Sequence, residues 1–289
     1  MAEHRIFQDA ALAADFREKG YVKVPLLDAD AVQQLRALYA EHLHGKMDGF
    51  HTTLLHESAT ARRTISDAII HLVEASLRRF LVDYRALVGN FVVKEPGENS
   101  VLPVHQDWSV VSEPEFTALN VWCGLQDITV TNGAIRMYPG SQRLARIPRS
   151  PSIPNPYQEA FGQIDAELVT EPVRAGEALI FEGSLVHGSF PNRSGARRLA
   201  TALIMIPESA QPWHYYYNSK GGKIEKFAID RDFFDTFRID QRPQGYAVAE
   251  AISWQEQRHD LRAMHRMIDP PQPLLRRVAA LFSGNRKKV

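Results

Sequence analysis

Two histidines and one carboxylate have the residue types and spacing to hold a metal ion. His105 and Asp107 are two residues apart, and on an extended strand such a pair projects from one face. His187 follows much later, inside a second apolar stretch. Two imidazoles and one carboxylate suit Fe(II), because they fill three coordination positions and leave the others open. Taken alone, a His-x-Asp pair is more often a solvated strand edge than a metal site, so the interpretation depends on the residues that accompany it.

An arginine downstream of His187 adds a candidate site for a carboxylate. Arg198 opens an apolar run that reads as a buried strand. Its guanidinium could grip a carboxylate through two parallel N–H···O bonds. Arg197 competes for this role, but alternate residues from Arg198 onwards share one face and Arg197 belongs to the other. The histidines, Asp107 and Arg198 together indicate a site for iron and a dicarboxylate cosubstrate.

The composition narrows the class of protein. The 289 residues include 34 Lys and Arg and 34 Asp and Glu, and this balance gives no reason to expect a nucleic-acid partner. A hydrophobic content of 44% is enough for a packed core. Cys123 is the only cysteine, which excludes an internal disulfide and a thiolate-rich metal site. We expect it to be a small buried residue on a strand.

No stretch indicates a membrane or secretory protein. The N-terminal residues are polar and lack the apolar segment of a signal peptide. No run approaches the roughly 18 uninterrupted apolar residues of a membrane span. We therefore expect a cytoplasmic localisation, which also suits a protein that holds Fe(II).

Hydrophobic periodicity predicts helices before a series of short strands. Helices are expected over residues 9–19, 28–43 and 64–87, with a short strand at 21–25. Turns rich in Gly and Pro separate the later strands, which favours a sandwich or jelly roll. The strands are expected at 87–94, 101–105, 117–128, 134–138, 168–173, 178–181 and 198–206.

Three further segments flank or follow these strands. The long proline-rich stretch 143–167 is interpreted as a lid over the site, since loops of this length in compact domains are usually functional. Helices are predicted over 230–239 and 249–267. The tail 270–289 is basic and amphipathic, and we expect it to pack against protein rather than lie on a membrane surface.

Five short motifs follow one another through the middle of the chain, namely residues 93–97, the box 105–107, Asn132-Gly133, residues 138–141, and the stretch from His187 to Arg198. In these motifs the chain resembles the phytanoyl-CoA dioxygenase family of Fe(II)/2-oxoglutarate-dependent oxygenases. One departure is Gln142, where relatives often carry histidine.

For the fold, the resemblance implies a mainly β protein with flanking helices, built as a double-stranded β-helix (a cupin-like jelly roll). Residues 1–269 are expected to form a single oxygenase domain. Its parts are a helical N-terminal part at 1–86, a β-helix core at 87–207 and a helical C-terminal part at 208–269, followed by the tail 270–289.

For the site, the resemblance implies that His105, Asp107 and His187 bind Fe(II) and that Arg198 binds 2-oxoglutarate. Asn120 and Trp122 are expected to line the cosubstrate pocket, as is Lys94, with a plain core role as the alternative for Trp122. The implied enzyme uses dioxygen to hydroxylate an unactivated C–H bond and releases succinate and CO2. Asp107 favours hydroxylation over halogenation, because halogenases replace this carboxylate by glycine or alanine.

The substrate is expected to be a small polar or amphipathic metabolite, bound by a monomer or a homodimer. Two other classes remain open. One is a cupin-like metal-binding protein without oxygenase activity, since one barrel hosts many functions. The other is a catalytically inactive structural relative. Succinate formation that depends on added Fe(II) separates the oxygenase from both.

Overall fold

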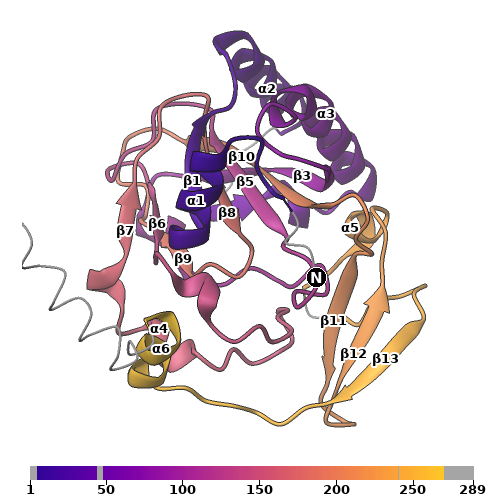
Figure 1. Ribbon diagram of the computed structural model, residues 1–289. Coiled ribbons are helices and arrows are strands. Elements are labelled where there is room, and N and C mark those ends of the chain that lie inside the picture. Colours follow the sequence, from indigo (N-terminus) through magenta and orange to yellow (C-terminus); the bar gives the residue numbers. More distant parts are fainter. Residues whose placement is uncertain (1–4, 44–47, 240, 270–289) are drawn as a thin grey trace, which may run out of the picture.

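The computed structural model describes residues 5–43, 48–239 and 241–269 (Figure 1). The predicted amphipathic tail 270–289 lies outside the described residues. None of the helices in the described part of the chain has the length and apolar character that a membrane span requires.

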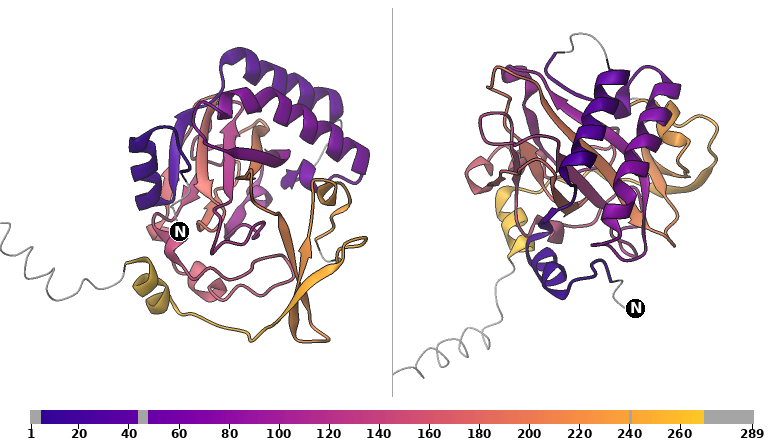
Figure 2. Two further views of the ribbon diagram at one scale, coloured as in Figure 1. Left: turned by 45° about the vertical axis from the view of Figure 1, so that its right-hand side comes forward. Right: turned by 90° about the horizontal axis from the view of Figure 1, so that it is seen from above.

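Two antiparallel sheets form the body of the protein, as a double-stranded β-helix requires (Figures 1 and 2). Their inner faces meet in one core cluster, in which Trp122 and Ala202 of the larger sheet lie with Ile135 and Met137 of the smaller. The six-stranded sheet has the order β1 (Tyr21–Pro25), β8 (Glu177–Glu182), β5 (Leu119–Gly124), β10 (Arg198–Pro207), β3 (Tyr84–Lys94) and β2 (Phe50–Thr52). The four-stranded sheet has the order β4 (Leu102–His105), β9 (His187–Ser189), β6 (Ile135–Met137) and β7 (Val169–Glu171). The predicted fold class is confirmed.

Helices α1 (Ala10–Lys19), α2 (Ala29–His42) and α3 (Ala59–Leu77) pack against the larger sheet (Figure 2). Alternation along the strands sends one set of side chains, including Phe91 and Leu203, into a core cluster with helix residues such as Ile69. Gly89 lets α3 pack closely against β3, because a Cβ at this position would lie 2.9 Å from Ile69 Cγ2. The other face of the sheet is thereby left for the site.

Helix α3 is shorter than the predicted helix at 64–87. It ends at Leu77, and Asp83 then adopts a left-handed backbone with φ 52°. A residue in that conformation interrupts a right-handed helix. Of the apolar residues that continue the helical spacing, Phe80 lies in a turn and Leu81 forms an isolated bridge with Phe7. Tyr84 begins β3, which pairs with β10.

The C-terminal part contains more strand than helix, so the predicted helical part 208–269 is wrong. Helices α5 (Phe233–Thr236) and α6 (Leu261–Ile268) occupy only fractions of the predicted ranges 230–239 and 249–267. Strand β13 (Val248–Ser253) instead pairs with β12 (Lys223–Ala228), which also pairs with β11 (Trp213–Asn218). Ala and Glu in β13 favour helix locally, but the backbone ladder to β12 determines the structure.

The proline-rich segment 143–167 packs beside the core, and none of its residues lines the cavity described below. Ile153 joins a cluster with Tyr215 of β11. Phe161, in the short helix α4 (Gln158–Phe161), packs with Met264 of α6. The interpretation as a lid is therefore wrong. The segment ties the C-terminal elements to the body.

Cys123 is fully buried on β5, as expected. It lies opposite Ala178 of β8 and Thr201 of β10, so strands cover it on both sides. Burial raises the pKa of its thiol to about 12. The cysteine is therefore a packing residue and not a nucleophile.

Lowering the pH below neutrality is expected to destabilise the protein through His214 of β11. Its ring packs against Phe233, with centroids 4.8 Å apart, and burial lowers its pKa to about 4. The unfolded histidine titrates near 6.5, so between about pH 6.5 and 4 the unfolded state binds a proton that the folded state does not. Through this group the free energy of unfolding should fall by about 2 kcal/mol between pH 7.5 and pH 5, and by about 3 kcal/mol at pH 4.

Urea denaturation at pH 7.5 and pH 5 measures this effect. His214→Phe should retain more of its stability at pH 5 than the wild type does. His71→Gln, which alters an exposed histidine, should behave like the wild type. An identical loss of stability in the wild type and His214→Phe would contradict the prediction.

Candidate metal centre and its cavity

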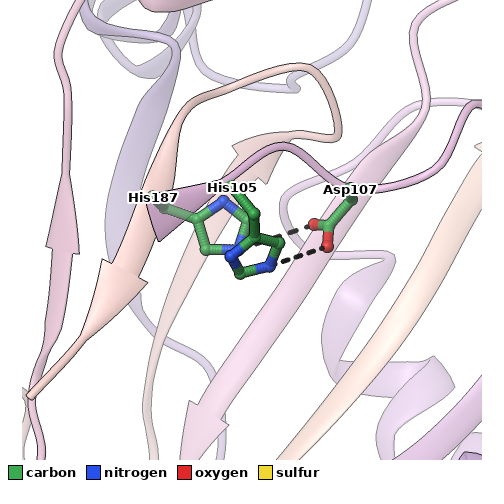
Figure 3. A group of neighbouring side chains, drawn as sticks. All are labelled: His105, Asp107 and His187. Carbon is green, nitrogen blue, oxygen red and sulfur yellow. Dashed lines mark ion pairs between the residues drawn. The ribbon is translucent and has the colours of Figure 1, made fainter. Parts of the chain in front are cut away.

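The three predicted ligands come together at the start of the smaller sheet (Figure 3). His105 ends β4 and His187 begins β9, and the two are register partners in this antiparallel pair. Asp107 lies two residues beyond β4. His105 Nε2 lies 3.6 Å from Asp107 Oδ1, and His187 Nε2 lies 3.7 Å from Asp107 Oδ2. All three candidate ligand atoms lie within 4.8 Å of one another, an arrangement that could hold a metal ion.

The backbone sets which nitrogen of each imidazole faces the carboxylate. His105 Nδ1 lies 2.8 Å from the Pro103 carbonyl oxygen, and His187 Nδ1 lies 2.9 Å from that of Leu185. A carbonyl oxygen only accepts, so each Nδ1 carries the hydrogen and each Nε2 keeps a free lone pair. Hydrogen bonds of this kind orient metal-binding histidines and fix their tautomer.

The electrostatics of His187 and Asp107 favour the protonation states that a cation needs, whereas those of His105 do not. Burial lowers the pKa of His105, but Asp107 and the Pro103 carbonyl outweigh it and raise this pKa, so a metal ion would have to displace a proton there. Burial lowers the pKa of His187 to about 4, so its imidazole is neutral at pH 7. Burial raises the pKa of Asp107, but the two histidines and Asn120 outweigh it and hold this pKa at about 2. An ionised carboxylate and a neutral imidazole are the forms that bind a divalent metal.

A cavity of about 270 Å³ opens beside the three side chains. Its wall comes from both sheets, including the edge strand β2, and from the turn η1 (Thr53–Leu55). The predicted residues Asn120, Trp122 and Arg198 line this cavity together with His105, Asp107 and His187, whereas Lys94 does not.

Arg198 is a buried cation without a carboxylate partner among the described residues. Its side chain is 1% exposed, and Nη1 donates to the Val92 carbonyl oxygen at 3.2 Å. Its Nε has no hydrogen-bond partner, and the guanidinium carbon lies 5.4 Å from the centre of the Trp122 ring. A buried guanidinium with free donors is costly unless an anion completes it. Arg198 is therefore a candidate to bind an anion in the cavity.

Arg197 points to the opposite face of β10, as strand alternation predicts. Its Nε donates to Glu95 Oε1 at 2.6 Å, and its guanidinium carbon lies 5.5 Å from the centre of the Tyr39 ring. It does not line the cavity. The geometry thus separates the two neighbouring arginines by their partners.

The remaining predicted residues have different surroundings. Asn120 Nδ2 donates to Asp107 Oδ2, so this amide orients the carboxylate. Trp122 is 4% exposed and both fills the core and lines the cavity. Lys94 Nζ donates to the carbonyl oxygens of Ser100 and Phe190, the latter at 2.8 Å. Burial, with a smaller effect of Arg198, lowers the Lys94 pKa to about 7.

Several residues of the cavity wall were not predicted. Those on β3 and β8 share a face with the predicted residues of neighbouring strands, so pairing the strands would have found them. Those from β2 and η1 carry no such signal, because their stretch lacks a clear period. The unpredicted polar and aromatic wall residues include Phe50, Thr52, Asn90, Phe181 and Ser189.

The fold and the cluster define a class, namely a double-stranded β-helix protein with a candidate site for one metal ion. The chain belongs to the phytanoyl-CoA dioxygenase (PhyH) family of the Fe/2-oxoglutarate-dependent oxygenase superfamily, whose model matches residues 16–200. This match confirms the resemblance, and its range includes every predicted site residue.

Sequence relatives carry the same family name. Phytanoyl-CoA dioxygenase 1 of Oryza sativa subsp. japonica is 29% identical over 126 residues, which are 43% of this chain and 45% of that protein. Phytanoyl-CoA dioxygenase domain-containing protein 1 of Danio rerio is 30% identical over 138 residues, which are 45% and 47% of the two chains. The matched region thus spans less than half the length of these relatives.

Solved structures share the fold. SnoK, a non-haem α-ketoglutarate-dependent carbocyclase from nogalamycin biosynthesis, is 21% identical with a TM-score of 0.52, over 71% of this chain and 86% of SnoK. HygX of Streptomyces hygroscopicus, solved with nickel, 2-oxoglutarate and hygromycin B bound, is 17% identical with a TM-score of 0.51, over 70% and 88%. These similarities support the double-stranded β-helix.

Proposed function

We propose that this protein is a non-haem Fe(II)- and 2-oxoglutarate-dependent dioxygenase that hydroxylates an unactivated C–H bond, with release of succinate and CO2. One observation carries the proposal: a cluster of two histidines and an aspartate shares a single cavity with a buried arginine that has no acidic partner in the described part of the chain. The cluster suits a divalent metal and the arginine suits a carboxylate, which are the two binding partners of this chemistry.

The residues present fit an iron ion. His105 and His187 would bind it through Nε2, and Asp107 through its carboxylate, which leaves three positions for other ligands. Bound Fe(II) supplies the activation of dioxygen that couples decarboxylation of the 2-oxo acid to oxidation of the substrate. The chain's own contribution is orientation, because Asn120 and the two backbone carbonyls hold the ligands in place.

Arg198 would bind the carboxylate of 2-oxoglutarate that lies far from the metal. The guanidinium is preformed, since the Val92 carbonyl and the Trp122 ring hold it in the wall. A bidentate pair in a water-poor cavity gives both affinity and orientation. Lys94 lies outside this cavity and its Nζ donates to two backbone carbonyls, so it would not contact the cosubstrate.

The substrate presents an uncharged, apolar part to the site. Among the described residues of the wall, the only ionisable side chains are His105, Asp107, His187 and Arg198, all of which the metal and cosubstrate would engage. An anionic substrate group would therefore find no further cation in this part of the wall. This favours an amphipathic metabolite that reacts at its apolar end. The apolar wall near the site includes Leu54, Leu55, Trp108, Val110, Ala118 and Ile204.

We also infer that residues 1–269 act as a single domain. Strand β1 belongs to the central sheet, although it precedes the predicted β-helix core. The C-terminal Phe227 and Phe233 lie in one core cluster with Leu87 of β3 and Val110. Both flanking parts thus share packing with the body.

Turnover of 2-oxoglutarate tests the proposed function. The purified apoprotein is incubated with 2-oxoglutarate and a set of amphipathic, polar and anionic compounds, with and without Fe(II). We expect succinate only with Fe(II), stimulated by amphipathic compounds that mass spectrometry shows to gain one oxygen. Metal binding without any Fe(II)-dependent succinate would favour the cupin-like alternative. Stimulation by anionic compounds alone would contradict the proposed substrate class.

A further inference from the structure

A buried ion pair lies directly behind the aspartate of the candidate metal centre. Arg149, in the proline-rich segment, is 5% exposed, and Glu113, in the loop between β4 and β5, is 9% exposed. Arg149 Nη1 donates to Glu113 Oε2 at 2.9 Å, and Nη2 donates to Glu113 Oε1. The pair is thus bidentate and neutral overall, which lets both charges remain buried.

The remaining donor of the guanidinium, Nε, contacts the backbone of the candidate metal ligand Asp107. Arg149 Nε donates to the backbone carbonyl oxygen of Asp107 at 2.8 Å. The backbones also exchange contacts one step away: Ser109 N donates to the Arg149 carbonyl at 3.0 Å, and Arg149 N donates to Ser109 Oγ at 3.2 Å. The proline-rich segment is therefore fastened to the chain on the C-terminal side of Asp107.

Asp107 needs such contacts because it lies beyond the end of β4. No strand ladder fixes its backbone. Its N–H donates to the Gly183 carbonyl at 3.1 Å, and its carboxylate accepts from Asn120. The Arg149 contact at its carbonyl completes a support on three sides.

We propose that Arg149, held by Glu113, is a positioning residue that fixes the backbone of Asp107 and so keeps its carboxylate in place for the metal. This inference rests on the proposed function only in taking Asp107 as a metal ligand. A planar guanidinium meets two carboxylate oxygens and a carbonyl at once, whereas a lysine ammonium cannot reproduce that geometry. In this role the proline-rich segment stabilises the backbone that carries the candidate metal ligand Asp107.

Cobalt(II) binding tests this role without turnover. Co(II) is titrated into the full-length apoprotein by calorimetry, and its visible absorption reports the geometry around the ion. Arg149→Lys and Glu113→Gln should each raise the Kd for Co(II) at least about tenfold, as loss of groups that support metal ligands generally does. The absorption bands should shift in both variants.

Arg143→Lys is the matched control. Arg143 belongs to the same segment and donates to the carbonyl oxygens of Glu18 and Ile268. Neither acceptor belongs to a candidate metal ligand. Its Kd should stay within about twofold of the wild type. A merely structural role for Arg149 would lower the melting temperature while leaving the Co(II) spectrum and Kd of the folded protein unchanged, which would overturn the proposal.

Ser109→Ala serves if the charged variants do not fold, because it removes one hydrogen bond to Arg149. Weaker Co(II) binding in this variant supports the proposal, and unchanged binding overturns it. A wild-type protein that does not bind Co(II) contradicts the proposed function itself. Tight wild-type binding with equally tight binding by every folded variant contradicts only the role of Arg149.

Discussion

His187→Ala is expected to reduce Fe(II)-dependent succinate formation by at least about 100-fold. The substitution removes one of three candidate ligands, and even groups that only support a ligand contribute about 10- to 100-fold to affinity or activity. The backbone of β9 does not depend on the imidazole, so the fold should survive. Loss of the packed ring, 4.8 Å from the Phe181 centroid, should lower the free energy of unfolding by about 1–3 kcal/mol.

His214→Ala controls for that loss of stability. Both histidines are 5% exposed and pack against aromatic rings, but His214 does not line the cavity. Its variant should be destabilised to a similar degree and retain turnover. Succinate is measured in initial-rate assays at saturating Fe(II), with chemical denaturation run in parallel. If His187→Ala formed succinate at the rate of the wild type, this histidine would be excluded as a ligand.

Arg198→Ala is expected to raise the apparent KM for 2-oxoglutarate about 100-fold. A charged bidentate contact in a water-poor site contributes roughly 2–3 kcal/mol, and each 1.4 kcal/mol corresponds to a factor of ten. Arg198→Lys should recover part of this loss, because it keeps the charge but not the planar fork. Initial rates of succinate formation over a range of 2-oxoglutarate concentrations give the KM.

Arg197→Ala is the control at the adjacent position. This side chain is 34% exposed and pairs with Glu95 on the other face of the sheet. Its removal should change the KM by less than about threefold. Equal increases in both variants would show that the effect comes from the strand as a whole and would refute a specific contact by Arg198.

The chemistry of the site was predictable because it depends on residue types and strand alternation. The face of Arg198 and the meeting of His187 with His105 and Asp107 follow from period two and from the family resemblance. The exact support of Asp107 was not predictable. It lies beyond β4, and its backbone is held by Gly183 and Arg149, whose proximity arises only from the tertiary fold.

The errors in the fold have the same origin. Strand β13 is rich in Ala and Glu, and only its pairing with β12 makes it a strand. The proline-rich segment was interpreted as a lid from its length, yet its partners are residues distant in sequence, such as Tyr215 and Met264. Lys94 shares a face with wall residues of β3, but it turns away to two backbone carbonyls. Such non-local contacts leave no local pattern in a sequence.

The burial of Cys123 gives the protein an intrinsic reporter of core opening. Its side chain projects from β5 into the core cluster between the larger sheet and the N-terminal helices, so a thiol-specific reagent can reach it only when this core opens. With a single cysteine in the chain, the labelling rate reports one opening event and needs no added tag. Ligands that bind only the closed form slow this labelling in proportion to their occupancy. The labelling rate of the Cys123 thiol therefore allows the binding of metal, cosubstrate and substrate to be compared before any turnover is measured.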